Sequence, residues 1–458
     1  MTVIWEHRSP CDWSVVLDEY PLARATEVIN AFERAERGLR WWQAVPPRER
    51  IARIRQLIAA IRANAFDWTE HLIREVGKPR GDAEGELAYG TALLDAVCAQ
   101  YESDIDDGAG HLRLRPHGLV GLITPWNNPF AIPFGKIIPA LIYGNGVVWK
   151  PALPAHGLSR IMFRSLDEAG LGEAVALVPG DAVTGKLLLD YPDLAAVSFT
   201  GSVDIGTQVV NHCHARAIPV QGELGGNNAA IILADVDVET VAADLAPAMF
   251  SFSGQRCTAI RRLIVERAIA PRFGEAISAA VTTLRAGMPE ARETQIGPVI
   301  SRERQEWLLE VIAGNLERGG RLLAGGGVPV GVPEAGCWVA PTIIACEHHG
   351  ASVMQTELFG PVAGLVVAED FDEALQLHNA TSYGLLGAIF THDRDHEARF
   401  LDQAQAGILS VNQARPAFAS SGPFLGWKAS GHGPPEHGRW NRDFYARPQA
   451  VYNATAAR

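Results

Sequence analysis

Gly118-Leu-Val-Gly-Leu-Ile-Thr-Pro-Trp-Asn-Asn-Pro129 begins the part of the chain that decides the fold. Its apolar first half predicts a short buried strand, and its proline and asparagine residues predict a turn at the carboxyl end of that strand. Alternating strands and helices continue to residue 199: strands at 146–149, 174–178 and 195–199, and helices at 131–141, 158–169 and 182–189. This alternation predicts a parallel sheet covered by helices.

The flanks of this region extend the α/β pattern. The first hundred residues are predicted to be helical, because apolar residues recur at spacings of three and four at Ile51, Ile54, Leu57, Ile58 and Ile61. Gly77-Lys78-Pro79 is a helix stop signal. The elements predicted downstream are a strand at 217–220, a strand at 229–233, helices at 271–285 and 302–318, a strand at 363–367 and an edge strand at 450–452. The length predicts two or three domains.

Composition fits a globular protein that acts on a small molecule. Of the 458 residues 47% are hydrophobic and 20% charged, and the net charge of −12 comes without a basic run, which argues against nucleic acid. No secretory signal or membrane span is expected, because Lys136 and prolines interrupt the longest apolar stretch, at 129–143. The six cysteines are scattered, which predicts reduced thiols, no bound metal and a cytoplasmic location.

Two segments in the middle of the chain carry the candidate chemistry. Gly254-Gln-Arg-Cys257 ends a small polar turn on a thiol, and Glu223-Leu-Gly-Gly-Asn227 places a carboxylate ahead of two glycines. A nucleophile and a base are the minimum for making and then hydrolysing a covalent acyl intermediate. Taken singly, each also fits a structural role, Cys257 as a buried thiol and Glu223 as a salt-bridged surface acid.

Turns after the predicted strands offer further candidates. Asn127 lies where ligands bind in open α/β sheets, and its amide suits a developing oxyanion. Ser202 suits the cap of a helix whose amino terminus faces a pyrophosphate. Lys150 suits a phosphate or a ribose hydroxyl, and Glu357 suits ribose hydroxyls. Turn formation, helix capping and solvation alone also explain these residue types.

Seven motifs in order make the chain similar to the aldehyde dehydrogenase superfamily. They are Pro125-Trp-Asn127, Val147-Val-Trp-Lys-Pro151, Phe199-Thr-Gly-Ser202, Glu223-Leu-Gly-Gly226, Gly254-Gln-Arg-Cys257, Glu357-Leu-Phe-Gly-Pro361 and Pro423-Phe-Leu-Gly-Trp-Lys-Ala-Ser-Gly431. The resemblance runs from about residue 25 to the C-terminus. It implies a Rossmann-type cofactor domain (1–99 and 117–225), an α/β catalytic domain (226–438) and a small β oligomerisation element. By analogy that element is a hairpin within 100–116 plus a strand within 439–458, which pair across a homodimer or homotetramer.

The same resemblance implies oxidation of an aldehyde to the carboxylic acid with NAD or NADP. Cys257 attacks the aldehyde, Asn127 and the Cys257 backbone N–H hold the oxyanion, and Glu223 then activates the water that hydrolyses the thioester. The residues implied to form the cofactor site are Thr124, Pro125, Trp126, Lys150, Gly180, Phe199, Gly201, Ser202, Leu224, Glu357 and Phe359.

Four features depart from the family pattern. Leu153 replaces an acid that many NAD-using relatives place on the ribose, so NADP stays open beside NAD. Asn128 replaces an aromatic residue, which predicts a polar aldehyde or semialdehyde. Gly433-Pro-Pro-Glu436 is one residue longer than usual, which leaves open a proton relay between Glu436 and Lys136. The short N-terminus is expected to lack an opening β-hairpin.

Two other functions stay open on the sequence. A CoA-acylating semialdehyde dehydrogenase transfers the acyl group to a thiol, and such relatives often lack the base, so Glu223 argues against it. A non-catalytic family member that serves as a binding protein would not need Cys257, Glu223 and Asn127 intact. The sequence does not name the aldehyde, whose choice is expected to depend on Asn128, Arg256, Thr258 and residues 414–421.

Overall fold

The computed structural model describes residues 3–106 and 112–452, and its first sheet confirms the predicted strand–helix alternation. The sheet has six strands in the order β18-β8-β7-β4-β5-β6, all parallel except β18, which pairs antiparallel with β8. The strands are β4 (Leu119–Thr124), β5 (Gly146–Pro151), β6 (Val175–Leu177), β7 (Leu194–Thr200), β8 (Val220–Glu223) and β18 (Gly431–His432). The helices between them are α5 (Ala131–Ile142), α6 (His156–Glu168), α7 (Ala182–Leu189) and α8 (Val203–Ala215).

The strand predicted at 217–220 instead begins at Val220 and runs to Glu223. Ala217 has a φ of 56°, and Pro219 has no N–H to donate to a neighbouring strand. The chain therefore turns before it enters the sheet, which places Glu223 at the last position of β8.

Helices predicted in the first hundred residues are present from residue 25 onwards. They are α1 (Ala25–Ala44), α2 (Pro47–Ala63), α3 (Ala65–Val76) and α4 (Arg80–Asp106). The five predicted apolar positions of α2 are buried, and α3 ends at Gly77, whose φ is 67°. Both faces of the first sheet are covered: Trp149 packs with residues of α2–α6, and Val148 packs with residues of α1, α7 and α8.

The opening segment corrects two predictions, because it is neither helical nor without a hairpin. β1 (Ile4–Ser9) and β2 (Asp12–Pro21) pair antiparallel, and Trp5 stacks on Tyr20 with ring centroids 5.5 Å apart. The start of β2 is fixed to a distant loop, because Trp13 N–H donates to the Ala335 carbonyl at 2.8 Å. A contact between residues so far apart in the chain leaves no signal in a short stretch of sequence.

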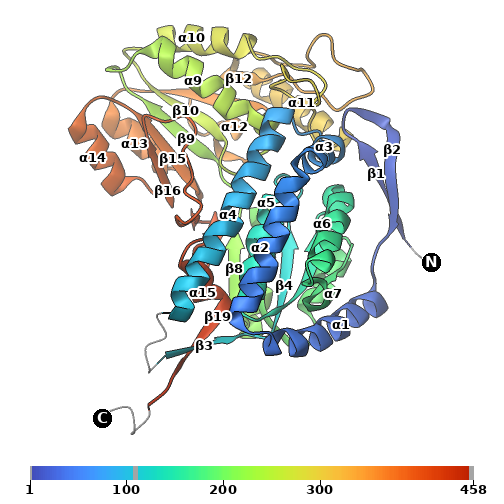
Figure 1. Ribbon diagram of the computed structural model, residues 1–458. Coiled ribbons are helices and arrows are strands. Elements are labelled where there is room, and N and C mark those ends of the chain that lie inside the picture. The colour runs from blue at the N-terminus through green and yellow to red at the C-terminus, as the bar shows by residue number, and fades with distance from the viewer. Residues whose placement is uncertain (1–2, 107–111, 453–458) are drawn as a thin grey trace.

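The second sheet has seven strands in the order β11-β12-β13-β10-β9-β15-β16, parallel except for β11 against β12. They are β9 (Asn228–Ile232), β10 (Ile260–Glu266), β11 (Arg321–Ala324), β12 (Thr342–Ala345), β13 (Val362–Ala368), β15 (Leu386–Phe390) and β16 (Ile408–Val411). Its helices are α9 (Val238–Phe250), α10 (Ala270–Thr282), α11 (Arg302–Glu317), α12 (Ser352–Gln355), α13 (Phe371–Asn379) and α14 (Arg394–Gln403). Figure 1 shows the two sheets in separate lobes.

A two-stranded ribbon joins the ends of two distant segments. β3 (Leu112–Pro116) pairs antiparallel with β19 (Ala446–Ala450), which follows α15 (Trp440–Tyr445), and Figure 1 shows the ribbon projecting from the lobe of the first sheet. The strand predicted at 450–452 thus lies earlier. Residues 100–106 belong to α4, so they form no part of a hairpin, and the predicted element's residues 107–111 and 453–458 lie outside the described residues. Across the described residues, no helix is both long and apolar enough to cross a bilayer.

Candidate active site

The site lies where the chain passes from the first sheet to the second. β8 ends at Glu223 and β9 begins at Asn228, so the short Gly-rich link between them joins the two sheets. A larger cavity of about 630 Å³ and a smaller cavity of about 390 Å³ adjoin there, and Cys257 lines both. The topology therefore places the predicted nucleophile at the junction of two ligand-sized spaces.

A strained turn presents Cys257 to the cavities. Phe252, Ser253 and Gly254 all have positive φ, at 49°, 53° and 65°. The Gly254 position also requires glycine, because a Cβ there would lie 2.3 Å from a backbone carbonyl. Gln255 fixes the turn by accepting a hydrogen bond from Ile300 N–H at 2.9 Å. Left-handed backbone at consecutive residues costs free energy and is typical of functional sites.

The Cys257 thiol is protonated in the free protein. Burial raises its pKa to about 12, with smaller contributions from the charges of Glu357 and Glu223. Arg256 and Arg261 lower the pKa but do not offset burial. Because the thiolate is the nucleophile, a base must accept this proton when Cys257 reacts.

Glu223 faces the smaller cavity with an unsatisfied carboxylate. Its side chain is 5% exposed, and its Oε2 has no hydrogen-bond partner among the described residues. Burial raises the pKa of Glu223 well above its ordinary value, and the negative charge of Glu436 raises it further, against a smaller opposing effect of Lys136. A carboxylate with a raised pKa and a free oxygen suits a general base working near neutral pH.

Glu436 reaches the site despite the longer segment that precedes it. Its carboxylate forms a buried ion pair with Lys136 Nζ, and both side chains are nearly inaccessible to solvent. Gln221 holds the extra residue in place, because its Nε2 donates to the two proline carbonyls of that segment at 3.2 and 2.9 Å. The pair therefore lies close enough to Glu223 to influence its pKa.

Asn127 is buried and held from two directions. Its Nδ2 donates to the Gln255 carbonyl at 3.1 Å, which uses one of its two amide hydrogens. Its backbone carbonyl accepts from Lys78 Nζ at 2.6 Å, and Lys78 also donates to Asn128 Oδ1 at 3.0 Å and pairs with the buried Glu86. Glu86 in turn accepts from the first two N–H groups around the start of α5, at 2.9 and 3.0 Å. This network fixes the Asn127 turn against α5.

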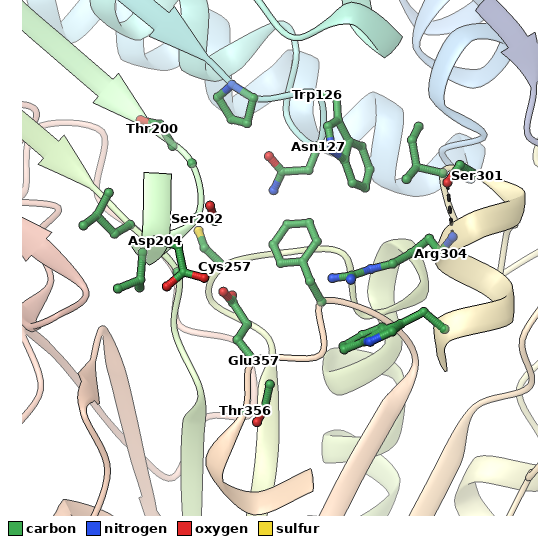
Figure 2. A pocket seen from close by; sticks show the side chains of 18 of the residues that line it. Trp126, Asn127, Thr200, Ser202, Asp204, Cys257, Ser301, Arg304, Thr356 and Glu357 are labelled. Carbon is green, nitrogen blue, oxygen red and sulfur yellow. Dashed lines mark hydrogen bonds between the residues drawn. The ribbon is translucent and has the colours of Figure 1, made fainter. Parts of the chain in front are cut away.

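The larger cavity contains most of the predicted cofactor residues, as Figure 2 shows for those it labels. Its lining includes Pro125, Trp126, Gly201, Ser202, Leu224, Glu357 and Phe359. Thr124, Lys150, Gly180 and Phe199 do not line it. Thr124 accepts from Trp149 Nε1 at 2.9 Å, and the buried Lys150 has its pKa lowered to about 8 by burial, with Asp181 opposing.

The residues of the larger cavity fit a dinucleotide. Ser202 caps α8, with its Oγ 3.5 Å from Ile205 N–H, so the amino terminus of this helix opens on the cavity. A Cβ at Gly225 would lie 1.9 Å from Glu357 Oε2, so only glycine leaves room for this acid. The Phe359 ring lies edge-on to Trp126, with centroids 5.7 Å apart, and offers an aromatic wall for a flat heterocycle.

Sequence reasoning missed several charged residues at the smaller cavity, which include Lys78, Asp82 and Glu86. None of the three belongs to a sequence motif for binding or catalysis. Lys78 had a signal only as part of a helix stop. Asp82 and Glu86 lie on α4, within a run whose charges resemble a solvated helix face. Their burial is a tertiary property, because it depends on α4 packing against the Asn127 turn.

Comparisons with known proteins agree with this geometry. A model described as the aldehyde dehydrogenase family matches residues 5–451. A Haloferax volcanii protein named alpha-ketoglutarate semialdehyde dehydrogenase is 32% identical, over 98% of this chain and 95% of its own length. A Bacillus subtilis protein named alpha-ketoglutaric semialdehyde dehydrogenase is 30% identical, over 97% and 93%. The crystal structure of a Mycobacterium tuberculosis aldehyde dehydrogenase complexed with NAD+ superposes with a TM-score of 0.92 at 28% identity, covering 100% of this chain and 96% of that one.

Proposed function

This chain belongs to the aldehyde dehydrogenase family and is an NAD(P)-dependent oxidoreductase that converts aldehydes to carboxylic acids, and from that premise we propose which residues perform the reaction and which aldehydes they accept. One observation carries the assignment. Cys257 lines both cavities, and Glu223 lines the smaller one with it. A nucleophile and a base thus share the space that an aldehyde would enter.

The Cys257 sulfur attacks the aldehyde carbon while the thiol proton is released to solvent, which gives the thiohemiacetal oxyanion. The developing oxyanion accepts hydrogen bonds from the second Asn127 amide hydrogen and from the Cys257 backbone N–H. Lys78 positions Asn127 through the backbone carbonyl. When bound in the larger cavity, the nicotinamide supplies the acceptor for the hydride, and Cys257 is left as a thioester.

Glu223 completes the reaction by removing a proton from water, which then attacks the thioester and releases the acid. The raised pKa of Glu223 matches this role, since a base of ordinary acidity would be too weak. The ion pair between Glu436 and Lys136 acts on Glu223 electrostatically. A CoA-dependent transfer would not need this base.

The decisive experiment is a panel of aldehydes assayed with NAD and NADP, with and without CoA. We expect reduced cofactor and free acid without CoA, and the highest kcat/KM for polar aldehydes and semialdehydes. The names of the Haloferax volcanii and Bacillus subtilis relatives and the polar Asn128 support that class. A strict CoA requirement would contradict hydrolysis, and cofactor binding without turnover of any aldehyde would favour a binding protein.

We propose that the enzyme accepts both NAD and NADP with weak discrimination. Leu153 offers neither a hydrogen bond to a ribose hydroxyl nor a repulsion against a 2′-phosphate. Fluorescence titration with each cofactor measures the two affinities, and a preference for NAD above about a hundredfold, which is about 2.7 kcal/mol, would refute this.

We propose a homodimer or homotetramer in which the β3–β19 ribbon pairs with another copy. The ribbon has only two strands, and isolated two-stranded ribbons are marginally stable in water. Sedimentation analysis of the intact protein tests the proposal, and a monomer at assay concentration would contradict it.

All six cysteines are free, which supports a cytoplasmic location.

A further inference from the structure

The charges lining the smaller cavity fall into two groups besides the Lys78–Glu86 pair. Lys78 is paired with Glu86, and Glu436 is paired with Lys136 from behind the lining. Glu223 belongs with this second pair, whose charges act on it, and burial lowers the pKa of His437 to about 4, which keeps that ring neutral. The other group in the described lining consists of Asp82, Arg256 and Arg415. Two cations against one anion leave this group net positive.

The Asp82 carboxylate already accepts hydrogen bonds from the protein. Asp82 accepts from Ser251 Oγ at 2.5 Å and from Phe252 N–H at 2.7 Å, which ties its carboxylate to the turn that carries Cys257. Arg415 Nη2 lies 3.8 Å from Asp82 Oδ1, too far for a hydrogen bond. Asp82 therefore accepts its hydrogen bonds from the turn and forms only a long ion pair with Arg415.

The two guanidinium groups keep donors for a ligand. Within the described chain, Arg256 donates one side-chain hydrogen bond to protein, from Nη1 to Ser251 Oγ at 3.1 Å, out of five N–H donors. Arg415 lies on the loop after β16, with its side chain half exposed. Burial lowers the pKa of Arg415, and the positive charge of Arg256 lowers it further, against an opposing effect of Asp82.

Much of the smaller cavity's lining around Cys257 and the two arginines is apolar. Ala131, Ile132 and Phe252 line the cavity with Cys257, and Phe418 lies beside Phe424 with ring centroids 5.8 Å apart. A ligand that fits this space is reactive at one end, apolar in the middle and anionic at the other end. Methylene groups suit the wall, and a carboxylate suits paired guanidinium groups.

We propose that Arg256 and Arg415 together bind the carboxylate of an ω-oxo acid whose aldehyde carbon reaches Cys257. The proposal rests on the proposed function and deepens it by naming the substrate class. The paired cations serve as the recognition element, and Asp82 limits their net charge, which favours a monoanion over a neutral aldehyde.

Matched substrates and matched variants test this carboxylate clamp, which consists of Arg256 and Arg415. The substrates are ω-oxo carboxylates of four to six carbons and the alkanals of equal length. The variants are Arg415→Met, Arg256→Met and Arg256→Lys, and the control is Arg394→Met, because Arg394 is 87% exposed on α14, outside both cavities. Far-UV circular dichroism and melting curves establish that each variant is folded.

We expect the unaltered enzyme to have a higher kcat/KM for the oxo acids than for the alkanals. Arg415→Met should lower kcat/KM for the oxo acids about 10- to 100-fold, because the substitution removes one partner of a hydrogen-bonded charge pair. The alkanals should stay within about threefold, and Arg256→Lys should retain more oxo-acid activity than Arg256→Met. Added salt should weaken the oxo-acid preference, because it screens exposed charges. Equal rates for the two substrate classes, or equal losses for both in Arg415→Met, would overturn the clamp.

A binding measurement separates this proposal from the catalytic one. Glutarate, a five-carbon dicarboxylate, should bind the unaltered protein in calorimetry and bind Arg415→Met about tenfold or more weakly, whether or not aldehydes are oxidised. If alkanals are oxidised but glutarate does not bind, the clamp is wrong and the proposed function stands. If glutarate binding depends on Arg415 but no aldehyde is oxidised, the clamp stands and the proposed function is wrong.

Discussion

Glu223→Gln tests the division of labour in the active site. The substitution keeps the size and one carbonyl oxygen of the side chain but removes the base. A positioned general base contributes roughly 10²–10⁴ to a rate, or about 2.7–5.4 kcal/mol of barrier. Because Glu223 is buried and its Oε2 accepts no hydrogen bond from the described residues, no neighbouring protein group is placed to substitute for it. We expect steady-state turnover to fall by about that factor.

The burst before the steady state is the sharper measurement. Each chain contributes one Cys257, so rapid mixing with aldehyde and cofactor should give about one reduced cofactor per chain before turnover stalls. The negative charge of Glu223 raises the pKa of the Cys257 thiol, so its removal lowers that pKa. If Glu223 acts only on water, the burst should therefore be as fast as in the unaltered enzyme or faster, and mass spectrometry should find an acyl group on Cys257.

Two results would refute this reasoning. A burst that is absent or slowed in step with turnover would mean that Glu223 accepts the thiol proton, which the raised pKa of Cys257 makes the main rival assignment. Turnover within about twofold of the unaltered enzyme would mean that another group activates water. Glu369→Gln is the control, since Glu369 is an exposed acid paired with Arg267 and should change neither phase.

Three further perturbations address the remaining parts of the site. Cys257→Ala should abolish turnover and leave the cofactor Kd near normal, and retained activity would refute the nucleophile. Glu436→Gln removes a like charge and should lower the pKa of Glu223, so the rising limb of the pH–rate profile should move to lower pH; an unmoved or raised limb would contradict the electrostatic coupling. Lys78→Met breaks a buried ion pair and should lower the free energy of unfolding, measured in urea, by about 3–5 kcal/mol. The control Lys186→Met breaks an exposed ion pair and should lower it by less than about 1 kcal/mol. Equal losses would show that the Lys78 network does not stabilise the fold.

Local patterns predicted much of the fold. The strands and helices between 118 and 199 are present within one or two residues, because short apolar runs, caps and turn residues act over a few positions. The hairpin at 4–21 escaped prediction because Pro10-Cys11, which joins its strands, is not one of the residue pairs that mark a two-residue hairpin turn. The strand ending at Glu223 was placed early because its boundary depends on a left-handed residue at Ala217.

The sequence by itself determined the reaction class, since the order of its motifs places a thiol, an acid and an amide among cofactor-type turns. Tertiary structure decided how those groups are tuned. Burial raises the pKa values of both Cys257 and Glu223, which favours the protonated thiol in the first case and makes the carboxylate a stronger base toward water in the second. Packing also brought Arg256 and Arg415 to one cavity from segments far apart in the chain. Charge and desolvation depend on neighbours in space, and a linear sequence does not contain those neighbours.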